Sequence, residues 1–114
     1  MSTSVYVSTS CHQGNRKYME DCYETKLTKS HHKPNLISGI YLGIFDGHGG
    51  FQAAQYAKEH LLTEISSQNG FWSKESSKVL NAIKTGFIAT HLKICQSVGR
   101  NNGNHFKSIP KAPY

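Results

Sequence analysis

The segment from Tyr41 to Gly50, YLGIFDGHGG, limits the possible folds of this chain more than any other segment. Residues 39–45 are almost continuously apolar, which predicts a buried strand. Asp46 follows that strand, and the glycines around His48 let the backbone approach a ligand closely, so the loop is suited to hold a metal ion. An Asp-Gly hairpin turn is the alternative, but residues 51–65 have helical spacing where a hairpin requires a returning strand.

Two amphipathic helices are predicted after this loop. The first begins near Gly50, and its apolar stripe consists of Phe51, Ala54, Ala57, Leu61 and Ile65. The second begins near Ser73, whose hydroxyl can cap it, with Glu75 in the first turn. We expect both apolar stripes to be core, the second consisting of Leu80, Ile83, Phe87 and Ile94. The periodicity ends at Val98, which predicts an irregular basic tail over residues 98–114.

The N-terminal part of the chain is predicted to supply two more strands. Val5–Ser10 is rich in β-branched and aromatic residues, and residues 13–15 have the composition of a turn. Residues 22–28 predict the next strand, with Tyr23, Thr25 and Leu27 on one face. A polar loop is expected over residues 29–38, where His31 and His32 are adjacent and are predicted to be solvated side chains and not zinc ligands.

Composition narrows the classes of function. The net charge is +6, but the basic residues are scattered without a block, which disfavours nucleic-acid binding. Cys11, Cys22 and Cys95 form no CxxC pair, which favours a reducing compartment. No apolar run reaches membrane-spanning length, and the first residues lack the pattern of a signal peptide. We therefore expect a cytoplasmic or nuclear protein that does not associate with membranes.

The acidic residues predict the chemistry. The chain has only two aspartates, and hard divalent ions such as Mg²⁺ or Mn²⁺ bind carboxylate and carbonyl oxygens. Arg16 can grip a phosphate in bidentate fashion, and His48 can protonate a departing alkoxide. Because metal-bound water is a nucleophile at neutral pH, these groups together fit phosphate-ester hydrolysis. The partial metal shell would consist of Glu20, Asp21, Asp46 and the Gly47 carbonyl.

A geometric condition applies to Glu20 and Asp21, which are adjacent in the sequence. Neighbouring strand residues point to opposite faces, so the pair can aim at one point only if the backbone bends or a bound water helps. An exposed acidic pair without a function is the alternative.

RKYMED is followed by FDGHGG, with a predicted strand, loop and strand between them. This segment resembles the start of the PPM (type 2C) metal-dependent serine/threonine protein phosphatases. The likeness extends into AAQYAKEHL and covers residues 5 to about 94. Within that family, GFWSKESSKVLNAIKTGFIATHL resembles the delta-type animal member. The resemblance implies an α+β fold, the N-terminal portion of an αββα sandwich with about three strands and two helices, and a centre of two Mg²⁺ or Mn²⁺ ions.

The resemblance also implies a role for each motif residue. Arg16 would bind the substrate phosphate, and His48 would be the general acid. Glu20 would contact metal through a water, whereas Asp21, Asp46 and the carbonyl of Gly47 would be direct metal ligands. Phosphoserine and phosphothreonine proteins would be the substrates of a monomeric enzyme.

The chain departs from the family pattern because the later segments that supply further aspartate ligands are missing. A half-formed shell should bind its ions weakly, so we expect little or no phosphatase activity from this chain alone and interpret it as a truncated N-terminal fragment over residues 1–114. The missing strands would also leave apolar faces uncovered. A non-catalytic phosphoprotein-binding or regulatory fragment is the alternative function.

Overall fold

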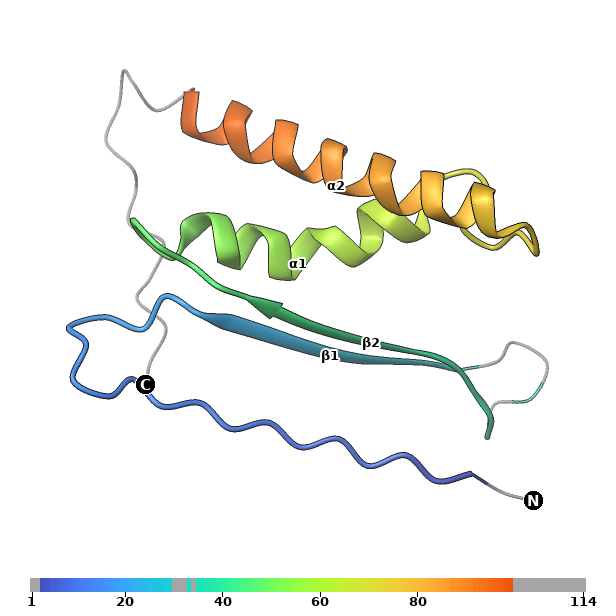
Figure 1. The fold of residues 1–114 in the computed structure, drawn as a ribbon, viewed down its shortest axis with the longest axis horizontal. Helices are drawn as coiled ribbons and strands as arrows, with labels where there is room; N and C mark the ends of the chain where they lie inside the picture. Colours follow the sequence, from blue (N-terminus) through green and yellow to red (C-terminus); the bar gives the residue numbers. More distant parts are fainter. Residues whose placement is uncertain (1–2, 30–32, 34, 100–114) are drawn as a thin grey trace.

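The computed structural model describes residues 3–29, 33 and 35–99 of the 114-residue chain. Its elements are, in chain order, strands β1 (Cys22–Lys29) and β2 (Ile37–Phe45) and helices α1 (Gln52–Ser66) and α2 (Ser76–Gly99). Figure 1 shows three layers, with α2 above α1 and α1 above the two-stranded sheet. This arrangement confirms the predicted α+β class and an incomplete domain. The tail predicted from residue 98 is helical through Gly99, and the rest of it lies outside the described residues.

The two strands form an antiparallel hairpin. Cys22 pairs with Phe45 at one end, and the regular register continues to the pair of Thr28 and Gly39, where a bulge follows. The predicted polar loop over residues 29–38 is too long, because Lys29 belongs to β1 and β2 begins at Ile37. His31 and His32 lie outside the described residues. The hairpin register fixes which residues before β1 lie next to those after β2.

In the part of the chain that the structure describes, helices cover one face of the sheet. Tyr41, Gly43 and Phe45 alternate with more exposed neighbours and are partly buried on the side where α1 lies. On the opposite face, Ile44 is 86% exposed. The prediction of a strand buried on both faces is therefore wrong, because none of the described residues forms a second layer on the outer face. The other exposed apolar residues of that face are Tyr23, Leu27, Ile40 and Leu42.

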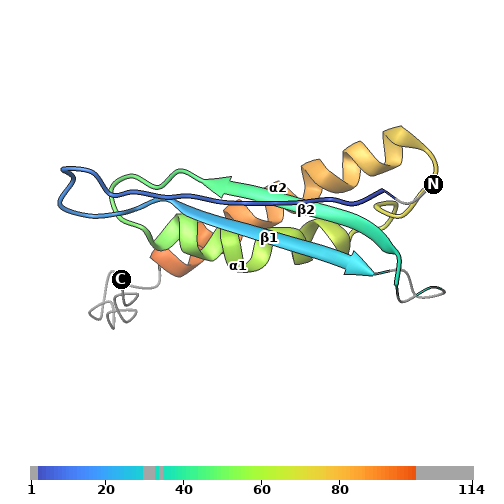
Figure 2. The same ribbon diagram turned by 90° about the horizontal axis from the view of Figure 1, so that it is seen from below.

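The strand predicted over Val5–Ser10 does not form. The segment is extended and runs along the side of the sheet away from the helices, as Figures 1 and 2 both show. It joins neither strand, and Tyr6 is 92% exposed. Strand propensity alone does not satisfy backbone N–H and C=O groups, which need a neighbouring strand. The described residues therefore contain two of the three expected strands.

The core lies between the helices. The stripe predicted on α1 is confirmed, because Ala54, Leu61 and Ile65 are buried. Helix α2 approaches α1 very closely, and a Cβ atom added to Gly86 would lie 2.7 Å from the Cα of Ile65. Thr90 is buried one turn later and satisfies its hydroxyl by donating a 2.8 Å hydrogen bond to the Gly86 carbonyl. Small residues thus set the distance between the two helices.

The stripe predicted on α2 is partly wrong. Leu80 and Phe87 are 66% and 55% exposed, whereas Ala82 and Gly86 are buried. The helix packs on α1 and, among the described residues, not directly on either strand, so Leu80 and Phe87 have no layer over them there, whereas Ile83 and Ile94 are partly buried. The helix also begins at Ser76, later than predicted. Ser73 still serves the turn before it, because its hydroxyl accepts the N–H of Glu75 at 3.0 Å.

Candidate functional site

The two acidic motifs meet at one end of the hairpin. Asp21 immediately precedes β1 and Asp46 immediately follows β2, and the terminal strand pair is Cys22 with Phe45. The antiparallel register therefore places the two aspartates beside each other along the backbone, at the end of the sheet from which α1 departs (Figure 1). Both carboxylates are exposed. The sequence alone did not establish this proximity, because it did not fix the pairing of the strands.

A hydrogen bond joins the two motifs directly. The Glu20 carboxylate accepts the backbone N–H of Gly50 through Oε1 at 2.7 Å. Gly50 has φ +119°, a conformation that residues with a side chain rarely adopt. A hydrogen bond to a charged acceptor is among the stronger ones in proteins. Glu20 thus holds the glycine loop against the segment that precedes β1.

Gly47 is packed against the same residue. A Cβ atom at position 47 would collide with the carbonyl oxygen of Glu20 and would lie 3.2 Å from the Glu20 Cβ. The two backbones are therefore in direct contact, and only glycine fits. This contact gives a physical reason for the glycine that follows Asp46, independent of any ligand. It also brings the Gly47 backbone beside the acidic pair.

Arg16 lies in a well-defined turn before β1. Gly14 has φ +63°, and its N–H is accepted by the Nδ1 atom of His12 at 2.9 Å. The side-chain amide of Gln13 donates to the Arg16 carbonyl at 2.7 Å. These bonds confirm the turn predicted over residues 13–15. They fix the backbone of Arg16 while its side chain remains exposed to solvent.

The residues present do not assemble a complete metal shell. Within residues 3–29, 33 and 35–99, no group of three or more His, Cys, Asp or Glu side chains is close enough to hold a metal ion. Asp21, Asp46 and the Gly47 carbonyl supply oxygen atoms of the kind that Mg²⁺ and Mn²⁺ bind. His48 is exposed on the same glycine loop. The site has the right chemistry in part, but it does not fit a metal ion as it stands.

Cys22 is a neighbour of the site that sequence reasoning did not single out. Its Sγ lies 3.6 Å from Oε1 of Gln55, which joins β1 to α1. Partial burial raises the pKa of this thiol, Lys58 partly offsets the rise, and the nearby charges of Asp21 and Glu59 add to it. The sequence does not indicate that Cys22 is partly buried, because Gln55 and the helix that covers the thiol are distant along the chain.

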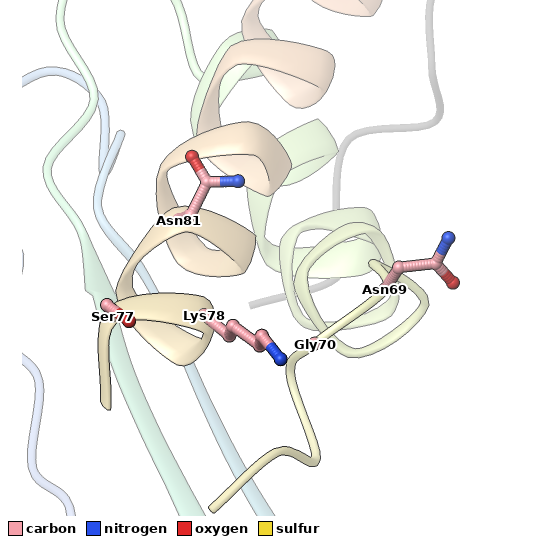
Figure 3. A pocket seen from close by; sticks show the side chains of 5 residues that line it. All are labelled: Asn69, Gly70, Ser77, Lys78 and Asn81. Atoms are coloured by element: carbon pink, nitrogen blue, oxygen red, sulfur yellow. The ribbon is translucent and has the colours of Figure 1, made fainter. Parts of the chain in front are cut away.

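A hollow lies away from this site, where α1 ends and α2 begins (Figure 3). Figure 3 shows side chains with amide, hydroxyl and ammonium groups around it. None of these residues belongs to the acidic or glycine motifs, so the hollow is not part of the candidate site. The lining residues are Asn69, Gly70, Ser77, Lys78 and Asn81.

The fold is a partial α+β domain in which the RKYMED and FDGHGG motifs are joined, and comparison with known proteins identifies its family. The model of the protein phosphatase 2C family matches residues 5–105, so the chain belongs to this family. The match extends beyond residue 94, where the resemblance in the sequence was expected to end.

Curated relatives have the same family name. The chain is 34% identical over 84 residues to protein phosphatase 2C homolog 2 of Schizosaccharomyces pombe. This alignment covers 74% of this chain and 22% of the relative. It is 30% identical over 106 residues to probable protein phosphatase 2C 2 of Paramecium tetraurelia, covering 92% of this chain and 32% of the relative. A match to probable protein phosphatase 2C 69 of Arabidopsis thaliana is 38% identical over 69 residues, or 60% of this chain and 18% of the relative.

The chain thus spans between about a fifth and a third of the length of these relatives. Across the part of the chain that the structure describes, neither helix has the combination of length and apolar content needed to cross a lipid bilayer.

Proposed function

We propose that this chain is the first part of a metal-dependent protein phosphatase domain that hydrolyses phosphoserine and phosphothreonine in proteins. Family membership supports a protein phosphatase. The observation that carries the proposal is the hydrogen bond from the Gly50 N–H to Glu20, because it joins the RKYMED and FDGHGG motifs at one end of the sheet.

Each motif residue has a role in this proposal. Arg16 binds the phosphate of the substrate through its guanidinium group. His48 donates a proton to the departing serine or threonine oxygen. Asp21, Asp46 and the Gly47 carbonyl are oxygen ligands for Mg²⁺ or Mn²⁺, and Glu20 acts through a water. Two such ions, when bound in a complete domain, would supply an activated water.

The same proposal predicts that the isolated chain turns over little or no substrate. The described residues hold no three-residue cluster of metal-ligating side chains, and a site with half its ligands binds ions weakly. The experiment therefore needs both the chain as it is and a context that supplies the missing length. The relatives are several times longer than the matched segment, which makes them suitable hosts.

The test is a chimera in which residues 5–94 of this chain replace the corresponding segment of the fission yeast relative. We expect Mn²⁺-dependent release of phosphate from a phosphothreonine peptide by the chimera and none above background by the isolated chain. Asp46→Ala should reduce the chimera's rate at least about a hundredfold, the order of effect seen when a group that stabilises the transition state is removed. Glu75→Ala is the matched control, because Glu75 pairs with Lys78 away from the site.

Two outcomes would overturn the proposal. An inactive but folded chimera would show that these residues do not support the reaction, and unchanged activity in Asp46→Ala would remove Asp46 from the site. Turnover by the isolated chain, lost in Asp46→Ala, would instead contradict only the expected inactivity of the fragment. A phosphoprotein-binding fragment without catalysis is less well supported, because the relatives carry the names of phosphatases.

Three finer points belong to the same proposal. The run over residues 70–92 supports placement near the delta-type animal member, although the matched relatives described above come from a yeast, a ciliate and a plant. Phosphoproteins are the proposed partners of a monomer.

A cytoplasmic or nuclear location is supported by cysteines without disulfide spacing. Fractionation of cells that produce the chain tests its location.

A further inference from the structure

A histidine and a cysteine are paired on the exposed surface of α2, apart from the phosphatase motifs. The Nε2 atom of His91 lies 3.6 Å from the Sγ atom of Cys95. The residues are four apart, so they lie one above the other on the same side of the helix. Both are exposed to solvent. Neither residue belongs to the RKYMED or the FDGHGG motif.

The distance between the two atoms fits a shared metal ion. Zinc bonds to sulfur at about 2.3 Å and to imidazole nitrogen at about 2.0–2.1 Å, so tetrahedral geometry places these two ligand atoms about 3.5–3.6 Å apart. Two ligands at positions i and i+4 of a helix are also the arrangement by which the HExxH motif binds zinc. We propose that His91 and Cys95 form a two-residue chelate for a thiophilic divalent cation of the zinc class.

The chelate differs in chemistry from the acidic motifs. Thiolate and imidazole select ions such as Zn²⁺ or Co²⁺, whereas carboxylate and carbonyl oxygens suit Mg²⁺ and Mn²⁺. On binding, the Cys95 thiol gives up its proton to solvent and the neutral His91 ring donates its Nε2 lone pair. The described residues contain no third side chain for the ion. Water or a donor from another molecule therefore completes the coordination, and the site is open to exchange.

The same distance also suits a simple hydrogen bond between thiol and imidazole, so the test must detect a metal–sulfur bond. Co²⁺ serves as the probe, because its bond to a thiolate gives a charge-transfer absorption band. The titration uses the full chain with Cys11→Ser, under reducing conditions, since Cys11 is a second exposed thiol. We expect the band to rise with added Co²⁺ to a plateau that corresponds to one bound ion per chain, and excess Zn²⁺ to remove it.

Matched variants locate the ligands. Cys95→Ser should abolish the band, and His91→Ala should weaken Co²⁺ binding about a hundredfold, the lower end of the gain from linking two binding groups. His60→Ala is the control on α1 and should change nothing, because His60 contacts Tyr56 and Glu59 and lies outside the pair. Circular dichroism of each variant checks that the helices persist.

A band that survives Cys95→Ser would assign the metal to another thiol and overturn the proposal. The absence of a band in the parent chain, or equal Co²⁺ affinity in His91→Ala, would also overturn the proposal. Either result would mean that His91 and Cys95 form only a hydrogen bond.

Discussion

The carboxylate of Glu20 and the backbone N–H of Gly50 are 2.7 Å apart, although one precedes β1 and the other precedes α1. A hydrogen bond to a charged group contributes about 1.5–3 kcal/mol when buried, and Glu20 is only partly buried. The bond therefore contributes to stability whether or not a metal is bound. Its effect can be measured in the isolated chain.

Glu20→Ala should lower the free energy of unfolding by about 1–2 kcal/mol, and Glu20→Gln should lower it less because an amide oxygen still accepts the bond. Urea denaturation followed by circular dichroism measures both. Glu75→Ala, which removes an exposed ion pair with Lys78, should stay within about 0.5 kcal/mol. Equal losses in Glu20→Ala and Glu75→Ala would contradict a stabilising role for the bond.

Gly47 and Gly49 should respond differently to substitution. Gly47→Ala drives a methyl group into the backbone of Glu20 and should cost about 1–3 kcal/mol of unfolding free energy. Gly49 has φ +68° but open space around it, so Gly49→Asn, a residue that tolerates this conformation, should cost less than about 1 kcal/mol. Chemical denaturation compares the two variants. A larger loss in Gly49→Asn would show that the contact with Glu20 is not the constraint.

Gly86→Ala tests the contact between the helices. Alanine has a better helix propensity than glycine by about 1 kcal/mol, but its methyl group would meet the backbone of Ile65 at 2.7 Å. Overpacking costs up to about 3 kcal/mol, so we expect a net loss of about 2 kcal/mol. Thr85→Ala, at an exposed position of the same helix, is the control and should be neutral or slightly stabilising. A rise in the unfolding midpoint of Gly86→Ala would refute the close approach.

The thiol of Cys22 should react slowly and affect stability at high pH. Burial, Asp21 and Glu59 raise its pKa above 9.0 and Lys58 partly offsets them, so less of the reactive thiolate forms at a given pH. The unfolded chain then releases this proton at lower pH than the folded chain, and stability should fall as pH rises above about 9. Cys22→Ser should remove that part of the decline. Alkylation followed by mass spectrometry should modify exposed Cys11 before Cys22, and the reverse order would contradict this.

Sequence patterns correctly predicted the elements whose structure depends on residues close together in the chain. The helical spacing of Ala54, Leu61 and Ile65 predicted the buried side of α1, and the composition of residues 13–15 predicted the turn before Arg16. These features depend on neighbours within a few positions. The resemblance to the family places the chemistry at one end of the sheets, and that placement stays a prediction.

Features that depend on distant partners were not predictable. Residues 5–10 have strand propensity but no strand beside them, and Phe87 has helical spacing but no layer over it. The burial of Gly86 follows from a helix contact that no pattern on α2 alone specifies. The hydrogen bond between Glu20 and Gly50 depends on the hairpin register, which the sequence did not fix.

The register of the hairpin divides the chain into parts that accept changes of length and parts that do not. A residue inserted between Lys29 and Ile37, beyond the bulge at Thr28, would lengthen a connection without disturbing the paired strands. One inserted between Cys22 and Thr28 would turn the side chains on one side of the insertion to the opposite face. It would also shift Asp21 relative to Asp46. Natural or engineered variation in length should therefore accumulate in the connection and be rare within the paired strands.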